Sequence, residues 1–305
     1  MKELKIGNGM ITASEIALGV MRIADCEKKE ASRLISAAID EGIDFFDNAA
    51  VYEDGKCEEI FGQIVSETAG LREKMIIQTK CGILPSSFDS SKEHILSSVE
   101  NSLKRLKTDY IDILLLHRPD ALVEPGEVAD AFDLLHSSGK VRYFGVSNHN
   151  SMQIELLSRY CNQRIMVNQL QLSIAHTAMI DAGLNVNMKN PPAVDRDGSI
   201  MDYCRLNDIT IQAWSPFRIS YDKEVFMGHS DYRRLDKKLD EIAKSKGTSA
   251  SAIVIAWILR HPAGIQAIVG TMNANRLKEI CKGSAVKLTR EEWYGIYMAA
   301  GNELP

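Results

Sequence analysis

The sequence predicts an α/β protein with the (β/α)8, or TIM, barrel fold, and three observations favour it. The chain has 305 residues, of which 45% are apolar and 25% charged, a composition typical of globular proteins. Short aliphatic segments alternate with helix-length segments eight times. Some of the short segments, such as residues 111–117, are apolar almost throughout, as in parallel strands buried on both faces. A six-stranded doubly wound sheet would leave two of the strands unassigned, so a closed barrel is favoured.

The expected strands are short and rich in β-branched or aliphatic residues. They cover residues 16–20, 45–47, 75–80, 111–117, 143–147, 166–171, 209–214 and 265–269. The expected helices carry their charged residues on one face. They cover residues 28–41, 58–67, 92–106, 127–138, 152–160, 199–207, 233–246 with 250–259, and 275–282. A further helix over residues 290–300 follows them, so extra helices are expected toward the C-terminus.

Two segments depart from a bare barrel. Residues 4–12 are expected to form an N-terminal β-hairpin around Asn8-Gly9, the dipeptide that suits a two-residue type I′ turn, and this hairpin could close the N-terminal end of the barrel. Residues 176–199 are too long for an ordinary connection between strand and helix. They are either a lid or specificity loop at the active-site face or an unstructured insertion. Without an internal repeat or linker, residues 1–305 are expected to form one domain.

Composition excludes several classes of protein. With 36 basic and 41 acidic residues the formal charge is −5, which argues against a nucleic-acid-binding protein. The longest apolar runs fall far short of the roughly 20 residues that span a bilayer, so no membrane association is expected. The six cysteines are scattered without a CxxC pair, which indicates reduced thiols in a cytoplasmic protein. The spacing of histidines and cysteines predicts no metal site.

Polar side chains stand where three successive expected strands end. Asp47 closes the second strand and is followed by Tyr52, Lys80 closes the third strand, and His117 closes the fourth. Each has an ordinary structural explanation when taken alone, such as a helix-capping carboxylate or a buried histidine. In a barrel, however, all four would meet at one mouth, where active sites form. A buried lysine also needs a carboxylate partner, which Asp47 can provide.

The sequence resembles the aldo-keto reductase family over nearly its whole length, and is closest to its bacterial members. Ordered segments at the strand ends carry the resemblance. They are G-I-D-F-F-D-N-A-A-V-Y (42–52), Q-T-K (78–80), L-L-L-H-R-P-D (114–120), G-K-V-R-Y-F-G-V-S-N (139–148), N-Q-L-Q (168–171), A-W-S-P (213–216) and I-V-G-T with N-A-N-R (268–276). The resemblance implies an oxidoreductase that transfers a hydride from NADPH to the carbonyl of a small aldehyde or ketone, which becomes an alcohol.

The family's catalytic positions match Asp47, Tyr52, Lys80 and His117. Because negative charge develops on oxygen as the hydride arrives, a proton donor must be near, and the resemblance assigns that role to Tyr52. Phenols have a pKa near ~10, and we expect the charge of Lys80 to lower it. Asp47 is expected to hold Lys80, and His117 to be neutral and to position the carbonyl oxygen.

The resemblance also implies the residues that bind the cofactor. Ser147, Asn148 and Gln169 match the polar groups that hold the nicotinamide carboxamide, and Trp214 matches the aromatic ring that stacks on it. The remaining positions line the ribose, pyrophosphate and adenosine 2′-phosphate: Gly19, Val20, Met21, Ser215, Phe217, Gly270, Thr271, Met272, Asn273 and Arg276. Arg276 offers planar donors to a phosphate, so NADPH is expected in preference to NADH.

The sequence departs from the family pattern in places, and two alternative functions are considered separately. Gly270 stands where many relatives have lysine, and Glu58 lies further from Tyr52 than usual, which implies a longer loop. A non-catalytic NADPH-binding redox sensor would keep the same fold and cofactor residues. A Schiff-base aldolase could use Lys80 as its nucleophile, but it would leave Trp214 unexplained. The expected partner is a small-molecule carbonyl substrate, and the chain is expected to be a monomer or a small homo-oligomer.

Overall fold

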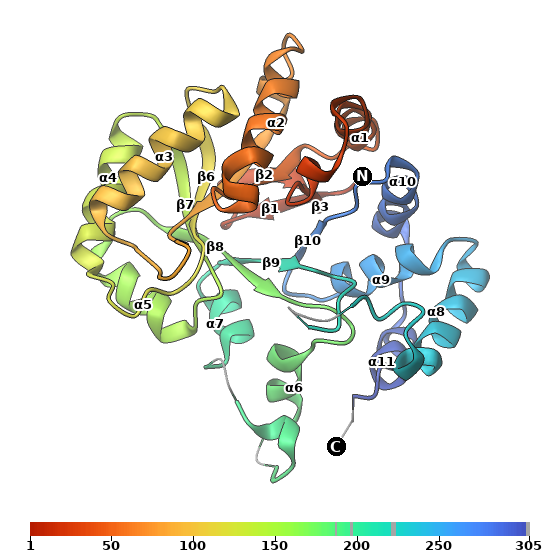
Figure 1. Ribbon diagram of the computed structural model, residues 1–305. Coiled ribbons are helices and arrows are strands. Elements are labelled where there is room, and N and C mark those ends of the chain that lie inside the picture. The colour runs from red at the N-terminus through yellow and green to blue at the C-terminus, as the bar shows by residue number, and fades with distance from the viewer. Residues whose placement is uncertain (187, 196–197, 221–223, 303–305) are drawn as a thin grey trace.

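Eight parallel strands close into a barrel in the order β10-β3-β4-β5-β6-β7-β8-β9 (Figure 1), which confirms the predicted fold. The computed structural model describes residues 1–302 apart from 187, 196–197 and 221–223. The barrel strands are β3 Ile16–Gly19, β4 Phe45–Asp47, β5 Ile76–Cys81, β6 Ile111–Leu116, β7 Val141–Ser147, β8 Ile165–Gln171, β9 Thr210–Trp214 and β10 Gln266–Val269.

Helices surround the barrel (Figure 1), and all but α6, which was not predicted, lie close to their predicted ranges. They are α1 Lys28–Asp40, α2 Lys56–Ser66, α3 Lys92–Leu106, α4 Pro125–Ser137, α5 Ser151–Tyr160, α6 Ala178–Leu184, α7 Ile200–Leu206, α8 Arg233–Lys246, α9 Ala250–Leu259, α10 Ala274–Cys281 and α11 Arg290–Ala299. Side chains cap several of these helices, as Ser91 does for α3 by accepting a hydrogen bond from the His94 amide. None of the described helices has the length and apolar character needed to cross a membrane.

The N-terminal hairpin closes one end of the barrel. Strands β1 Glu3–Ile6 and β2 Ile11–Ser14 pair antiparallel. Ile6 and Ala13 are fully buried in a cluster with interior residues of the barrel. The Gly7 amide also donates to the Thr210 hydroxyl at 3.0 Å. Because Thr210 begins β9, the hairpin lies at the amino ends of the strands, opposite the mouth where the polar strand ends meet.

The turn of this hairpin differs from the prediction. Ile6 pairs with Ile11, so the connection has four residues, Gly7 to Met10, and the predicted two-residue turn is wrong. Gly7, Asn8 and Gly9 all have positive φ, at 58°, 61° and 85°. A β-carbon at residue 7 would lie 2.7 Å from Cβ of Met166, so glycine is required there. Contact with the barrel floor therefore sets the turn.

The extra helices cover one side of the barrel. Helix α9 is apolar on all faces, and residues Ala252–Ile258 are buried in it, because α8 and α10 pack against it on the side away from the strands. Trp257 of α9 and Trp293 of α11 stack with ring centroids 4.8 Å apart. Each indole donates to the other residue's carbonyl, at 3.1 and 2.9 Å. This reciprocal contact joins α11 to α9.

The long segment after β8 is partly helical. Residues 187, 196 and 197 lie outside the described residues, and α6 forms its first part. Asp181 of α6 accepts hydrogen bonds from the hydroxyl of Tyr297, at 2.5 Å, and from that of Thr177, at 3.0 Å. Thr177 also bonds to Asn302 at 3.1 Å. The start of this segment is therefore attached to the C-terminal helix, so the described part is not an unstructured insertion.

Candidate active site

Asp47, Lys80 and Tyr52 form one hydrogen-bonded group at the carboxyl ends of β4 and β5. The Lys80 Nζ atom lies 2.8 Å from Asp47 Oδ2 and 2.8 Å from the carbonyl oxygen of Asn48. It also donates to the Tyr52 hydroxyl at 3.1 Å. Lys80 and Asp47 are 1% and 3% exposed. The strand ends predicted to converge therefore do so, and the buried lysine has the carboxylate partner that its burial requires.

A left-handed turn follows Tyr52 and leads into α2. Glu53, Asp54 and Gly55 have φ of 46°, 52° and 90°. A β-carbon at Gly55 would come within 2.7 Å of Arg105. Arg105 is held in place by Glu58 of α2, whose carboxylate it contacts at 2.7 Å. This turn lies where the late position of Glu58 predicted a longer loop, and two non-glycine residues with positive φ make it costly to form.

Burial and charge act in opposite directions on the lysine and the phenol. Burial alone would lower the pKa of Lys80, but the Asp47 carboxylate and the Tyr52 hydroxyl outweigh it, so the pKa is raised and the ammonium stays charged. Burial raises the pKa of Tyr52, and the positive charge of Lys80 only partly opposes this. The expectation that Lys80 would lower this pKa below its ordinary value is therefore wrong, because desolvation of the phenolate is the larger effect.

His117 lies beside Tyr52. Their rings are 5.9 Å apart between centroids and nearly perpendicular, at 82°. Burial, together with the charges of Lys80 and Arg118, lowers the pKa of His117 to about 2. The imidazole is thus neutral, as predicted, and one ring nitrogen can donate a hydrogen bond while the other accepts.

Three of the predicted nicotinamide contacts adjoin one another at the ends of β7, β8 and β9. The side-chain NH2 group of Asn148 donates to the Ser147 hydroxyl at 2.8 Å, and the Trp214 indole donates to the side-chain oxygen of Asn148 at 3.3 Å. Ser147 in turn donates to the backbone carbonyl of Gln169 at 2.9 Å. The Gln169 side chain is 3% exposed, and its Nε2 atom donates to Asp47 Oδ1 at 3.1 Å.

The chain after Trp214 turns back across the barrel mouth. Ser215 has a φ of 50° and its carbonyl accepts from the Arg218 amide at 3.0 Å. Phe217 is half-buried against the core, and its carbonyl accepts from the Phe226 amide at 3.0 Å. Residues 221–223, which follow Ser215 and Phe217 in the same loop, lie outside the described part of the chain.

The residues predicted to hold the adenosine 2′-phosphate gather around the start of α10. Gly270, Thr271 and Met272 follow β10, and Asn273 caps α10 by accepting from the Arg276 amide at 2.9 Å. Arg276 is exposed on the first turn of this helix, where the backbone amides and the helix dipole favour an anion. The residue types at this helix terminus fit a phosphate.

The first βα loop lies beside the segment that leads from β10 into α10. Gly19 pairs with Asp47, and Val20 donates its amide to the Asp47 carbonyl at 3.0 Å. Met21 is 47% exposed next to them. The guanidinium of the following residue, Arg22, donates to the carbonyl of Gly270. Arg22 was not predicted as a site residue, although its position directly after the three predicted loop residues was a usable signal.

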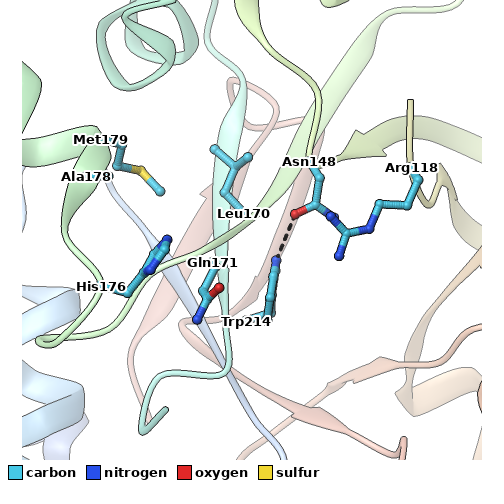
Figure 2. A pocket seen from close by; sticks show the side chains of 8 residues that line it. All are labelled: Arg118, Asn148, Leu170, Gln171, His176, Ala178, Met179 and Trp214. Carbon is cyan, nitrogen blue, oxygen red and sulfur yellow. Dashed lines mark hydrogen bonds between the residues drawn. The ribbon is translucent and has the colours of Figure 1, made fainter. Parts of the chain in front are cut away.

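A pocket of about 390 Å³ opens next to the catalytic group, on the side of β7, β8 and β9. Figure 2 shows its lining: Arg118, Asn148, Leu170, Gln171, His176, Ala178, Met179 and Trp214. Asn148 and Trp214 connect it to the predicted nicotinamide contacts, whereas Tyr52 is not part of the lining. Gln171 is a polar residue at the end of β8, so the pattern that identified Asp47 and Lys80 could have identified it as well. His176, Ala178 and Met179 come from the segment after β8, and no such signal in the sequence pointed to them.

Comparisons with known proteins agree with this architecture. A profile of the Aldo/keto reductase family matches residues 15–298. The uncharacterized oxidoreductase YcsN of Bacillus subtilis (strain 168) is 36% identical over 96% of this chain and 96% of its own. The 6-dehydroglucose reductase of Novosphingobium aromaticivorans is 32% identical over 99% of this chain and 96% of its own. A crystal structure of a thermostable aldo-keto reductase in complex with the inhibitor epalrestat has a TM-score of 0.79 and 26% identity, covering 98% and 100% of the two chains.

The structure is a (β/α)8 barrel whose strands end in polar side chains at one mouth. Together with the similarities to known reductases, this fold and this site identify the class of protein as an oxidoreductase. The chain belongs to the aldo/keto reductase family. Members of this family generally bind NAD(P)H and act on small carbonyl compounds. Within the described residues, no group of three or more His, Cys, Asp or Glu side chains is arranged to hold a metal ion.

Proposed function

We propose that this protein reduces the carbonyl of a small aldehyde or ketone to an alcohol with NADPH, and that Tyr52 donates the proton. The hydrogen bond from Lys80 to the Tyr52 hydroxyl carries this proposal. An ammonium group has no acceptor, so the phenol oxygen must accept from Lys80. The phenol's own hydrogen is then left for another acceptor, such as a carbonyl oxygen.

Each catalytic residue has a separate role in this scheme. When bound, NADPH supplies the hydride that reduces the carbonyl carbon. Tyr52 gives its proton to the oxygen, and Lys80 stabilises the phenolate that remains. Asp47 keeps Lys80 charged and in place. Neutral His117 donates a hydrogen bond that orients the carbonyl oxygen.

NADPH is the proposed cofactor because the α10 end of the site suits an additional phosphate. Arg276 and the first amides of α10 provide donors there. Arg22 is a second arginine at this end, and its guanidinium donates a hydrogen bond to the carbonyl of Gly270. Position 270 is where many relatives have lysine. Both cations favour a doubly charged phosphate over the hydroxyl of NADH.

For the substrate, we infer an aldehyde that carries hydroxyl groups. The pocket combines polar residues with the apolar Leu170 and Met179. The Nε2 atom of Gln171 is buried and has no hydrogen-bond partner among the described residues, so it can donate to an oxygen of a bound molecule. A relative of this chain is named a 6-dehydroglucose reductase, which makes a sugar aldehyde the first compound to test.

The direct test follows NADPH consumption with 6-dehydroglucose, with simple apolar aldehydes and with diketones. Turnover with NADPH, and a kcat/KM higher for the hydroxylated aldehyde, is the expected result. NADPH binding without turnover on any carbonyl would favour the redox sensor. Borohydride trapping of a carbonyl compound on Lys80 in the absence of NADPH would favour the aldolase.

We also infer that residues 1–305 act as one domain, since one apolar core joins the strands to the surrounding helices.

A further inference from the structure

Three glutamine side chains in the interior of the barrel form a ring of hydrogen bonds with the Asp47 carboxylate. The Nε2 atom of Gln78 donates to Asp47 Oδ1 at 2.7 Å and to Gln212 Oε1 at 2.8 Å. The Nε2 atom of Gln169 donates to the same two oxygens, at 3.1 and 3.2 Å. These bonds close a ring of Asp47, Gln78, Gln169 and Gln212, the amide ring, whose side chains are at most 3% exposed.

The amide ring connects opposite walls of the barrel. In the closed order of strands, β4 with Asp47 stands opposite β8 with Gln169, and β5 with Gln78 stands opposite β9 with Gln212. Gln212 then donates to Gln266 Oε1 at 2.8 Å. Gln266 donates to the Ser14 carbonyl of the hairpin, also at 2.8 Å. A continuous set of hydrogen bonds therefore runs from the barrel floor to the catalytic carboxylate.

The orientation of every amide in this set is determined by its two ends. Asp47, as the carboxylate paired with Lys80, only accepts, so Gln78 and Gln169 must present their NH2 groups to it. Each NH2 group uses its second hydrogen on Gln212, which must present its oxygen. Gln212 must then present its own NH2 group to Gln266. The backbone carbonyl of Ser14 also only accepts, so Gln266 must present its NH2 group to Ser14 and its oxygen to Gln212.

We propose that Gln212 is a positioning residue for catalysis: it holds the two amides that fix Asp47, and through Asp47 it fixes Lys80 beside Tyr52. This inference rests on the proposed function. Among the described residues Gln212 makes no hydrogen bond to Lys80 or Tyr52, but it accepts one hydrogen from each amide that holds Asp47 Oδ1. Asp47 Oδ2 is thereby directed at Lys80.

The same geometry restricts what Gln169 can do for a cofactor. Both hydrogens of its amide are used within the amide ring, so its Oε1 atom is the polar atom that retains bonding capacity. Gln169 can therefore accept from the NH2 group of a nicotinamide carboxamide but does not donate to it. Loss of Gln212 would free one of these hydrogens and loosen both interactions of Gln169.

The experiment compares glutamine-to-glutamate changes at two adjacent links. When protonated, the new carboxyl of Gln212→Glu can accept from Gln78 and Gln169 and donate to Gln266, as the amide does. When ionised, it cannot donate, and it places a second negative charge near Asp47. Burial raises the pKa of such a carboxyl, so the change falls in an accessible pH range. Gln266→Glu is the matched control, since Gln266 is equally buried but lies outside the amide ring.

We expect kcat of Gln212→Glu to approach the wild-type value at acid pH and to fall by about tenfold or more as its carboxyl ionises. The kcat of Gln266→Glu should stay within about threefold of wild type over the same range. Ultraviolet titration of tyrosinate, with Tyr52→Phe subtracted, gives a readout independent of turnover. It should show a shift of the Tyr52 titration in Gln212→Glu and in Gln212→Met but not in the Gln266 variants.

Equal kcat profiles and equal Tyr52 titrations for the Gln212 and Gln266 variants would overturn the proposal, because both residues would then be structural only. Circular dichroism and urea unfolding identify variants that fail to fold. Gln212→Met, which has an apolar side chain of similar volume, provides a second variant for the test if Gln212→Glu does not fold. A wild-type protein that reduces no carbonyl contradicts the proposed function instead, and the tyrosinate titration still decides the role of Gln212.

Discussion

The hydroxyl of Tyr297 donates a 2.5 Å hydrogen bond to Asp181, which connects the C-terminal helix to the helix that lines the pocket. Tyr297 is 1% exposed. Burial and the Asp181 carboxylate both raise its pKa well above the ordinary range, so it remains a donor at every working pH. Two residues before Asp181 stands Met179, part of the pocket wall. The position of that wall therefore depends on α11.

Removing this hydroxyl should affect substrate binding more than chemistry. Tyr297→Phe leaves Asp181 short of one donor, and we expect a loss of about 1–2 kcal/mol of folding stability. We expect KM for the carbonyl substrate to rise by about threefold or more while kcat changes less. Steady-state kinetics and urea unfolding measure these effects. Tyr294→Phe, on the same helix, is the control, and an equal rise in KM there would rule out the specific contact.

Tyr52→Phe should abolish reduction without loss of the cofactor. General acid catalysis contributes roughly 100- to 10,000-fold, so kcat should fall by at least the lower figure. NADPH affinity, measured by fluorescence titration, should change little because Tyr52 is not among the proposed cofactor contacts. Tyr160→Phe, an exposed change on α5, provides the reference. Turnover near the wild-type level in Tyr52→Phe would show that another group supplies the proton.

The Lys80–Asp47 pair should be costly to break from one side. Lys80→Met leaves the Asp47 carboxylate buried without its cation, and we expect a loss of about 3–5 kcal/mol of folding stability. The double variant Lys80→Met with Asp47→Asn should recover much of this stability, because the neutral amide oxygen can still accept from Gln78 and Gln169. Its activity should stay low. Urea unfolding of the two single variants and the double variant tests this, and additive losses would contradict the coupling.

His117 should make folding stability depend on acid pH. Its pKa is lowered from 6.5 to about 2 in the folded protein, so below pH 6.5 the unfolded chain binds a proton that the folded protein does not. Stability is therefore complete above pH 6.5 and decreases as pH falls, by at most about 1.4 kcal/mol per pH unit from this group.

The comparison of wild type with His117→Gln isolates this contribution, because His149, whose pKa burial lowers to about 4, is present in both proteins. The difference in unfolding free energy between them should change steadily from pH 6.5 downward. A difference that is constant with pH would mean that His117 titrates normally in the folded state.

Cofactor preference should depend on two arginines at the α10 end of the site. Arg276→Met should raise KM for NADPH by about tenfold and leave KM for NADH nearly unchanged, since only NADPH carries the 2′-phosphate. Arg22→Met should act in the same direction. Lys278→Met removes an exposed cation from the same helix and serves as the control. If all three variants weaken NADPH binding equally, only the general positive charge matters.

The sequence was sufficient to predict the barrel because short aliphatic segments alternate with helix-length segments eight times. The prediction of residues 92–106 as a helix agrees with α3, and Asp47, Lys80 and Tyr52 came together because parallel strands share one mouth. The direction of the Tyr52 pKa shift could not be predicted, since it depends on how far the surrounding residues exclude water. The amide ring was missed as well. Its glutamines interrupt apolar strands, a visible signal, but their pairing requires the positions of opposite strands.

The three tryptophans give the protein two separate fluorescence reporters: Trp214, and the stacked pair of Trp257 and Trp293. These two indoles are 1% and 8% exposed and are held between α9 and α11. The third tryptophan, Trp214, is partly exposed in the pocket (Figure 2). Emission from the stacked pair should therefore follow global unfolding, and quenching of Trp214 should follow occupancy of the pocket. With Trp214→Phe as the reference, one fluorescence spectrum can distinguish a ligand that binds from a chain that unfolds.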